Sequence, residues 1–275
     1  MGPKRSFKSY TTVPNELRLN GKGILVTRPA HQAQQLIKQI ESHGGVVFPF
    51  PVMEIIQPRD ITPALTLFHH LDRFDIAIFI SANAARIGVE MMQQEGDIPK
   101  TIQFAAVGLA TARALEMAGY SADILPENSF DSEGLLATPQ LQDINGKNIL
   151  IIRGEGGREL LAKTLRDRGG AVTYAEIYRR TIPQTDPSPI IEAWKHNSIH
   201  AAVITSNQGL TNLMQMVGKA GEQFLLQTPL VVISERTREV ARESGFSGKL
   251  MLATPPSDDA ILDTLSRWAQ KNSDS

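Results

Sequence analysis

The chain carries one pattern of residues twice, and this duplication limits its possible folds more than any other feature. The stretch GKGILVTRP at 21–29 reappears as GKNILIIRG at 146–154, which places Arg28 and Arg153 125 residues apart. Further landmarks keep a separation of 125 or 126 residues: Gly44 with Gly169, Ser81 with Ser206, Thr111 with Thr237, and Gly119 with Gly245. Because this period is far longer than a solenoid repeat, each copy is expected to form a domain with its own core.

Within each copy, unbroken apolar segments alternate with segments of helical periodicity. The runs IAIFI at 76–80 and LVVIS at 230–234 do not alternate apolar with polar residues, which is typical of strands covered on both faces in a parallel sheet. The first helix of each copy is expected to end at Gly44 or Gly169. The repeated order of strand and helix predicts an α/β protein with two similar parallel-sheet domains.

Two long segments interrupt this order at equivalent places in the two copies. The segments VVFPFPVMEIIQP at 46–58 and AVTYAEIYRRTIP at 171–183 are extended in character and end in proline. We expect them to be linker strands that pair antiparallel and form a hinge between the domains.

The turn RGEGGRE at 153–159 follows a predicted strand and precedes a predicted helix. A dinucleotide-binding loop requires a glycine where this chain has Glu159, and no Gly-Lys-Ser/Thr sequence follows. Nucleotide binding is therefore disfavoured. The backbone N–H groups of the turn, together with Arg153 and Arg158, are still expected to receive an anion.

Hydroxyl and amide side chains stand at other places where a predicted strand passes into a helix. Ser81 and Asn83 do so in the first copy and Ser206 in the second, while Thr111 and Thr237 follow the next strands. Each one alone is more simply explained as part of a helix start. Together they mark the carboxyl ends of parallel strands, where open α/β sheets bind ligands.

Charge and composition exclude several classes of function. The net charge is −1, from 28 basic and 29 acidic residues, so no basic surface for nucleic acid or an anionic membrane is expected. The absence of cysteine excludes disulfides and thiolate chemistry, and His196 and His200 lack the companion ligands of a zinc site. Residues 1–22 contain no apolar signal region, so we expect a loose leader and a cytoplasmic protein.

Tyr178, on the second linker segment, admits two interpretations. A tyrosine at a hinge packs its ring against apolar surface and leaves its hydroxyl in water. The same phenol is able to donate a proton in a cleft between domains. The residues alone leave both possibilities open.

A set of stretches along the chain resembles the uroporphyrinogen-III synthase family, most closely its bacterial members: ILVTRP, FISANA, FAAVGLATARAL, LIIRGEGGRELL, YAEIYRR, VITSN and VVISERTREVARESGF. The resemblance covers residues 23–268 and implies two flavodoxin-like domains joined by an antiparallel two-stranded linker, with the first strand–helix unit exchanged between the repeats. It implies these boundaries: 23–45 with 184–270 as domain 1, 57–172 as domain 2, and 46–56 with 173–183 as the linker strands. The repeat alone would divide the chain near residue 145.

The resemblance also implies the reaction. Members of the family convert hydroxymethylbilane to uroporphyrinogen III with loss of water and inversion of ring D, in haem and sirohaem biosynthesis, which makes them carbon–oxygen hydro-lyases. No cofactor or metal is expected, and we expect a monomer. Tyr178 matches the family's candidate proton donor.

The implied substrate carries an acetate and a propionate on every pyrrole, so it is a flexible polyanion that needs many hydrogen-bond donors. Its expected contacts are Arg28, Ser81, Asn83, Thr111, Arg153, Gly154, Gly157, Ser206 and Thr237. The second copy has Ser234 where the first has Gly108, which favours tight binding to the middle domain.

Two rival functions stay open on the sequence. A two-lobed small-molecule binding protein would also use a hinge to close on its ligand. A nucleotide-sugar transferase would have two α/β lobes as well, but the incomplete glycine motif disfavours it.

Overall fold

The computed structural model describes residues 19–157 and 159–271. The chain divides into two compact units, unit 1 (Met1–Glu54 with Ile182–Ser275) and unit 2 (Ile55–Thr181). Most of the expected leader, residues 1–18, and Arg158 lie outside the described residues. Leu19, the first described residue of the expected leader, is buried in the core of unit 1, and its N–H donates to the His43 carbonyl at 3.0 Å.

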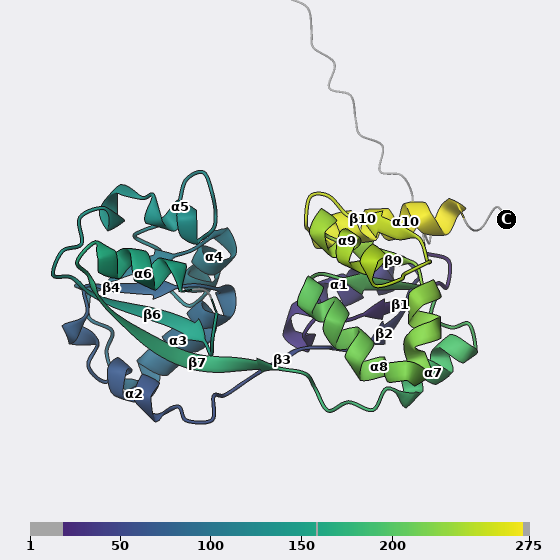
Figure 1. Ribbon diagram of the computed structural model, residues 1–275, viewed down its shortest axis with the longest axis horizontal. Helices are drawn as coiled ribbons and strands as arrows, with labels where there is room; N and C mark the ends of the chain where they lie inside the picture. Colours follow the sequence, from purple (N-terminus) through teal and green to yellow (C-terminus); the bar gives the residue numbers. More distant parts are fainter. Residues whose placement is uncertain (1–18, 158, 272–275) are drawn as a thin grey trace, which may run out of the picture. The chain divides into compact units, whose positions relative to one another are not determined.

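Unit 1 contains a five-stranded parallel sheet in the order β10-β9-β8-β1-β2 (Figure 1). Its strands are β1 (Gly23–Val26), β2 (Val46–Pro49), β8 (Ala201–Ile204), β9 (Leu230–Val232) and β10 (Leu250–Leu252). Its helices are α1 (Ala30–Ser42), α7 (Ser188–Lys195), α8 (Asn207–Gln227), α9 (Glu235–Glu243) and α10 (Asp258–Lys271). Strands from both ends of the chain therefore share one sheet, because β1 lies between β2 and β8.

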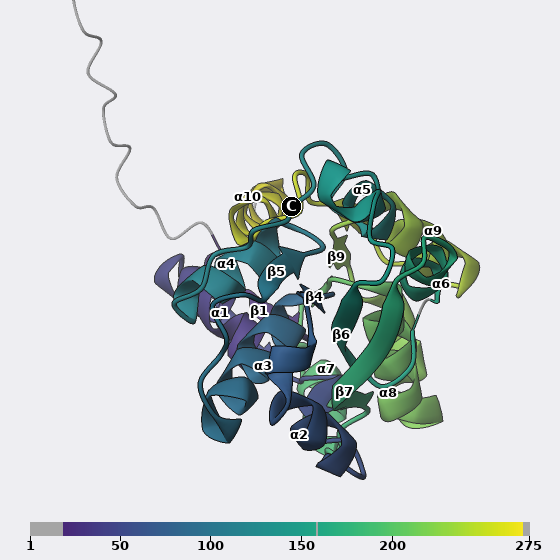
Figure 2. The ribbon, with the colours of Figure 1, turned by 90° about the vertical axis from the view of Figure 1, so that its left-hand side faces the viewer.

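Unit 2 contains the second sheet, in the order β3-β7-β6-β4-β5, in which β7, β6, β4 and β5 run parallel (Figure 2). Its strands are β3 (Glu54–Ile56), β4 (Ile76–Phe79), β5 (Gln103–Ala106), β6 (Asn148–Gly154) and β7 (Ala171–Thr181), with β3 at the boundary between the units. Its α-helices are α2 (Thr62–Phe68), α3 (Ala82–Glu95), α4 (Leu109–Met117), α5 (Ser132–Leu136) and α6 (Leu160–Asp167), and short 3₁₀ turns occur at Leu71–Arg73 and Pro139–Leu141.

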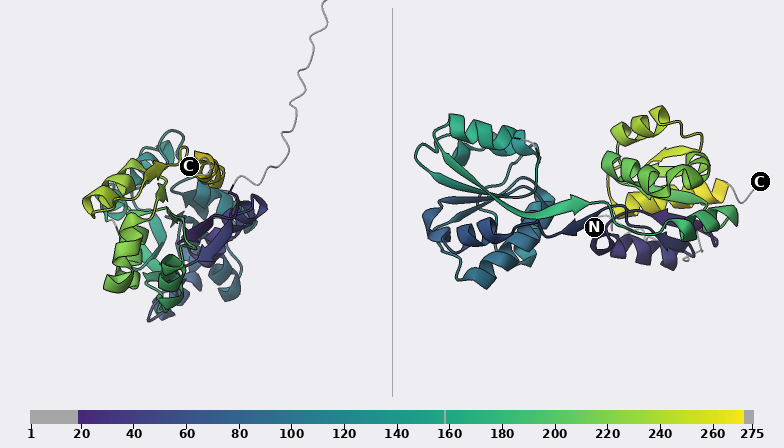
Figure 3. Two further views of the ribbon diagram at one scale, coloured as in Figure 1. Left: turned by 90° about the vertical axis from the view of Figure 1, so that its right-hand side faces the viewer. Right: turned by 60° about the horizontal axis from the view of Figure 1, so that its bottom comes forward.

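Helices cover both faces of each sheet (Figure 3). In β6, Leu150 and Ile152 pack into the core under α2, α3 and α4, while Ile149 and Ile151 pack into the core under α5 and α6. Successive residues of a strand point to opposite faces, so a strand covered on both sides needs apolar residues at every position. This burial explains the unbroken apolar runs of the sequence, and the predicted α/β class with two parallel sheets is confirmed.

The duplication is visible in the order of the strands. In each sheet the strand that opens the repeat, β1 or β6, lies next to the strand that carries the serine landmark at its end, β8 or β4. The place of β10 is taken in unit 2 by a single parallel bridge between Ala105 and Ile124. The predicted domain boundaries, the exchange between repeats and the antiparallel direction of the linker stay predictions.

Candidate functional site

A pocket of about 510 Å³ lies in unit 2 at the carboxyl ends of β4, β6 and β7. Its wall combines the end of β4, the first residue of α5, the glycine turn after β6, and the end of β7. The lining residues are Ile80, Ser132, Ile151, Arg153, Gly154, Glu155, Gly156, Gly157, Leu161, Tyr178, Arg179 and Arg180. The glycine turn and Tyr178, which the sequence brought forward separately, therefore line one pocket.

A bulge in β7 determines which way Tyr178 points. Arg153 of β6 pairs with Glu176, but the next residue, Gly154, pairs with Tyr178, so Ile177 has no partner in β6. Tyr174 packs with the core under α5 and α6, and simple alternation would send Tyr178 to the same face. Tyr178 instead packs with Ile177 in the core under α3, because an extra residue in one strand re-aims the side chains that follow it.

The hydroxyl of Tyr178 meets the start of helix α3. Its Oη lies 3.0 Å from the Oγ of Ser81, and that Oγ accepts the N–H of Ala84, also at 3.0 Å. Ser81 is thus the N-cap residue of α3, the expected role for a serine between a strand and a helix. Only 2% of Tyr178 is exposed, so its phenol borders the pocket while its ring is packed in protein.

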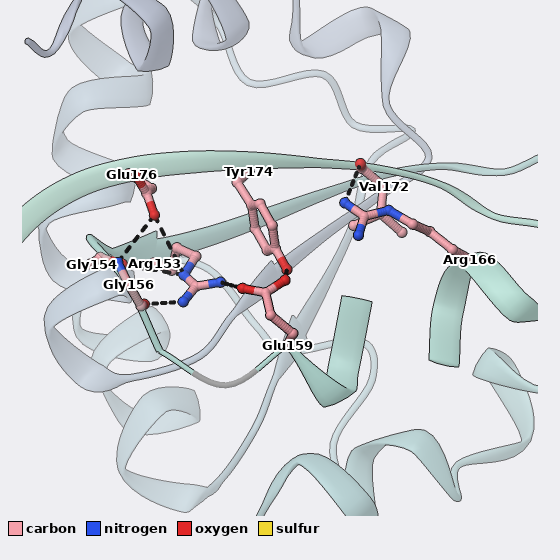
Figure 4. Close-up of polar contacts among 8 residues, drawn as sticks. All are labelled: Arg153, Gly154, Gly156, Glu159, Arg166, Val172, Tyr174 and Glu176. Carbon is pink, nitrogen blue, oxygen red and sulfur yellow. Dashed lines mark hydrogen bonds and ion pairs between the residues drawn. The ribbon is translucent and has the colours of Figure 1, made fainter. Parts of the chain in front are cut away.

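Arg153, predicted to receive an anion, makes its contacts with the protein itself (Figure 4). Its guanidinium is 2% exposed and donates to the carbonyls of Gly154 and Gly156 and to Glu159 Oε1, the last at 3.2 Å. The guanidinium carbon also stands 4.6 Å from the centre of the Tyr174 ring. Arg153 therefore fixes the shape of the glycine turn.

Carboxylates complete the support of this turn. Glu176 Oε1 accepts the N–H of Gly156 at 3.2 Å and lies 3.9 Å from Arg153 Nε. Tyr174 donates to Glu159 Oε2 at 2.6 Å; this hydrogen bond lowers the pKa of the Glu159 carboxyl, and burial together with the same bond raises the pKa of Tyr174. The turn needs glycine because Gly156 and Gly157 have φ values of +70° and +116°, which other residues rarely adopt.

Arg179 and Arg180 bring positive charge to the end of β7. Arg179 Nε donates to the Gln57 carbonyl at 3.3 Å. The guanidinium of Arg180 is 5.9 Å from the centre of the Tyr178 ring, and no carboxylate of the described residues lies within ion-pair distance of it. Arg180 is therefore an exposed cation of this pocket wall, close to the Tyr178 ring.

Two further predicted contacts of unit 2 lie on helix starts outside the pocket wall. Asn83 is half-buried in the first turn of α3, and Thr111 is buried in the first turn of α4, where its N–H donates to the Gly108 carbonyl at 3.0 Å. The space beside Gly108 is occupied by Phe130, since an added Cβ would stand 3.3 Å from the Phe130 Cβ and carbonyl oxygen. This glycine serves the packing of a neighbouring loop, which is a different reason from the close ligand approach expected from the sequence.

The remaining predicted contacts belong to unit 1, and each has a partner there. Arg28 forms an ion pair with Asp258. Ser206 caps α8 by accepting the Gly209 N–H at 3.0 Å, and Thr237 is buried and donates to Asn207 Oδ1 at 2.7 Å. Ligand contact by any of the predicted residues stays a prediction.

The sequence reasoning missed Ser132, Arg179 and Arg180. The signal for Ser132 is the repeat, because Ser132 and Asp258 are 126 residues apart and open corresponding helices. In unit 1 the aspartate neutralises Arg28, whereas in unit 2 the uncharged serine borders the pocket. The signal for the two arginines is their position directly after Tyr178 on an extended segment.

Comparisons with known proteins agree on one family. A sequence model described as Uroporphyrinogen-III synthase HemD matches residues 34–262. The uroporphyrinogen-III synthase of Escherichia coli K12 is 32% identical over 244 residues, which cover 88% of this chain and 99% of that protein, and the Salmonella typhimurium LT2 protein gives the same figures. A crystal structure of a mutant uroporphyrinogen III synthase from Thermus thermophilus matches with a TM-score of 0.61 at 19% identity, over 91% of this chain and 100% of that chain. The Helicobacter pylori 26695 enzyme matches with a TM-score of 0.53 at 15% identity, over 88% of this chain and 97% of that chain.

Proposed function

The chain belongs to the uroporphyrinogen-III synthase family of tetrapyrrole biosynthesis, and from this premise we propose that the pocket of unit 2 carries the chemistry. The substrate is hydroxymethylbilane, and the reaction is that of a cyclising carbon–oxygen hydro-lyase. The observation that carries the proposal is the Tyr178 phenol, which borders a pocket with a cation beside it. The alternative of a two-lobed binding protein is not favoured.

The reaction requires a proton for the leaving hydroxyl and a fixed geometry for ring closure. The terminal hydroxyl of the substrate must leave as water, which requires a proton, and the azafulvenium cation so formed must be attacked by the substituted carbon of ring D. A spiro intermediate then fragments and recloses with ring D inverted. Because closure without the enzyme gives no inversion, the protein's main contribution is to hold one geometry of the chain.

Tyr178 is the proposed proton donor. Its phenol carries an O–H group, which is a possible general acid for a departing hydroxyl. The bulge at Ile177 and the hydrogen bond to Ser81 hold this phenol at the pocket wall. The buried ring leaves the hydroxyl little freedom to rotate away, which is what a positioned acid requires.

The carboxylates of the substrate are received by the cations and the turn of the same pocket. Arg179 and Arg180 provide the charge, and Gly157 is proposed to add its backbone N–H, since those of Glu155 and Gly156 already donate within the protein. Arg153 contributes by keeping that turn in shape. Substrate binding by Ser206 and Thr237 of unit 1 stays a prediction from the sequence.

Product analysis tests this function. The chain is incubated with enzymatically generated hydroxymethylbilane, and the uroporphyrinogen isomers are oxidised and separated. Isomer III is expected, whereas isomer I alone, as formed without protein, would overturn the assignment. Tyr178→Phe is expected to lower the rate of isomer III formation by about 100-fold or more, the usual contribution of a general acid.

Tyr120→Phe is the matched control for Tyr178→Phe. Tyr120 lies in the same unit, but its hydroxyl accepts from Gln93 Nε2 at the long distance of 3.5 Å, and the residue is not among those that line the pocket. Full activity in this variant would show that removing a tyrosine hydroxyl from unit 2 is not harmful in itself. A Tyr178→Phe enzyme as fast as the Tyr120→Phe enzyme would remove Tyr178 as the acid.

The absence of a cofactor, the monomeric state and the cytoplasmic location stay predictions. No helix of the residues that the structure describes is long and apolar enough to cross a membrane. Activity that survives dialysis against EDTA would agree with chemistry that needs no metal, and gel filtration at assay concentration would give the oligomeric state.

A further inference from the structure

The hydroxyl of Ser81 has one hydrogen and two lone pairs, and the structure shows the partners of two of these three positions. One lone pair accepts the N–H of Ala84, which caps helix α3. The same oxygen also lies 3.0 Å from Tyr178 Oη. Because either oxygen of this pair is able to donate, the Ser81 hydroxyl can donate to the phenol oxygen, which leaves the phenol hydrogen for the substrate, and it can keep this hydrogen bond to a phenolate.

The start of helix α3 places a hydrogen-bond donor beside the phenol oxygen. Ser81 begins a helix of 14 residues, whose N-terminus carries a partial positive charge. Tyr178 is 2% exposed, so water alone cannot solvate a phenolate there and the protein has to supply its hydrogen-bond donors. The serine hydroxyl is such a donor, already aimed at the oxygen.

The duplication separates this contact from simple helix capping. Ser206 caps α8 of unit 1 as Ser81 caps α3 of unit 2. Each serine Oγ accepts the backbone N–H of the residue three positions later in the chain, at 3.0 Å. The residue 125 positions before Tyr178 is Met53, which has no hydroxyl. Capping therefore occurs in both copies, whereas the serine–tyrosine pair occurs in unit 2, where the pocket lies.

We infer that Ser81 is a positioning residue of the dehydration step, resting on the proposed role of Tyr178. Tyr178 transfers its proton to the terminal hydroxyl of the substrate as the carbon–oxygen bond breaks, so that water leaves and a phenolate remains. The Ser81 hydroxyl donates its hydrogen to that phenolate and stabilises it. Ring closure replaces a carbon–hydrogen bond by a carbon–carbon bond and releases one proton, which restores the phenol.

A double-mutant cycle tests the inference. Ser81→Ala and Tyr178→Phe are made singly and together, and kcat and KM for isomer III formation are measured. A hydrogen bond to a charged group supports an expected loss of about 10-fold to 100-fold in kcat for Ser81→Ala, with KM nearly unchanged. In the Tyr178→Phe background the same substitution should change kcat by less than about 2-fold, because two residues that act together are not additive.

Equal losses of kcat in both backgrounds would overturn the inference, since Ser81 would then act only through the start of α3. A change confined to KM would overturn it too and return Ser81 to a contact with the substrate. If the wild-type chain yields isomer I alone, the proposed function itself fails, which is a different result from a missing coupling in a chain that makes isomer III.

Further variants separate the cap from the hydroxyl. Glycine is tolerated at an N-cap position, so Ser81→Gly should fold normally and still show the loss of kcat. Ser81→Thr keeps a hydroxyl and should recover most of the activity. Ser206→Ala removes the corresponding cap from α8, and its thermal unfolding measures the stability cost of losing such a cap. A Ser81→Ala enzyme that shows the same stability cost and the wild-type kcat would overturn the inference.

Discussion

Gly154 passes so close to the ring of Tyr178 that a Cβ at this glycine would stand 2.5 Å from the Tyr178 Cε2. The two residues are paired across β6 and β7, directly after the bulge. No real Cβ is found at such a distance, so the glycine is a condition for the observed place of the tyrosine. Gly154 was predicted as a backbone donor to the substrate; its visible role is to leave room for the ring.

Gly154→Ala is therefore expected to displace Tyr178. Overpacking of this kind costs about 1–3 kcal/mol of stability, and the rate of isomer III formation should fall with the displaced phenol. Denaturant unfolding and product assays measure the two effects. In a Tyr178→Ala background the ring is gone, so Gly154→Ala should cost almost nothing there; an equal cost in both backgrounds would mean that the clash lies elsewhere.

Arg153 is expected to act on stability more than on substrate affinity. Its buried guanidinium donates to the carbonyls of Gly154 and Gly156, and hydrogen bonds from a charged donor contribute about 1.5–3 kcal/mol. Arg153→Met should destabilise the chain by about that amount in urea unfolding. Unchanged stability with a raised KM would show the opposite, that the guanidinium serves the substrate.

Arg180 should give the reverse result. It is exposed beside Tyr178, so Arg180→Gln should alter stability by no more than about 0.5 kcal/mol. Loss of a charged contact to a substrate carboxylate should raise KM by about 10-fold and weaken its dependence on salt. Arg166→Gln makes the same charge change at a residue outside the pocket wall and is the control. Equal KM changes in the two variants would point to a general effect of charge.

The fold was largely predictable because the duplication indicates two similar domains and the unbroken apolar runs indicate buried strands. Leu150 and Ile152 face one core and Ile149 and Ile151 the other, so the absence of alternation in the sequence followed from a sheet covered on both faces. The N-cap role of Ser81 was predictable for a similar reason, since serine at a strand-to-helix junction has few better explanations.

The bulge and the contacts of Arg153 were not predictable in the same way. Alternation along β7 places Tyr178 on the face of Tyr174, and nothing local at Ile177 signals the register shift that moves it. The ion-pair partner Glu176 is distant from Arg153 in the sequence and comes close to it through strand pairing. An arginine at a strand end was therefore expected to face a ligand, while the folded chain surrounds it with its own acceptors.

His200 makes the stability of unit 1 dependent on pH. Its Nδ1 accepts the N–H of Gly23 at 2.9 Å, at the amino ends of the paired strands β1 and β8. This hydrogen bond requires the neutral ring. Burial, and then the positive charge of Lys22, lower the pKa of His200 below its usual value of 6.5. The unfolded chain therefore binds the proton more readily than the folded chain. The contribution of His200 is fully present above about pH 6.5 and is lost as the pH falls through the lower folded pKa.

Urea unfolding at a series of pH values between about 5 and 8 tests this dependence, the range around the ordinary pKa of histidine. The wild-type free energy of unfolding should fall on the acid side. His200→Asn keeps an acceptor near Gly23 but does not titrate, so its curve should be flatter over the same range. His196→Asn is the control, because His196 is exposed and its Nδ1 lies 2.9 Å from the backbone carbonyl oxygen of Glu192 instead of a backbone N–H. If the His200→Asn curve falls as steeply as the wild-type curve, another group carries the pH dependence.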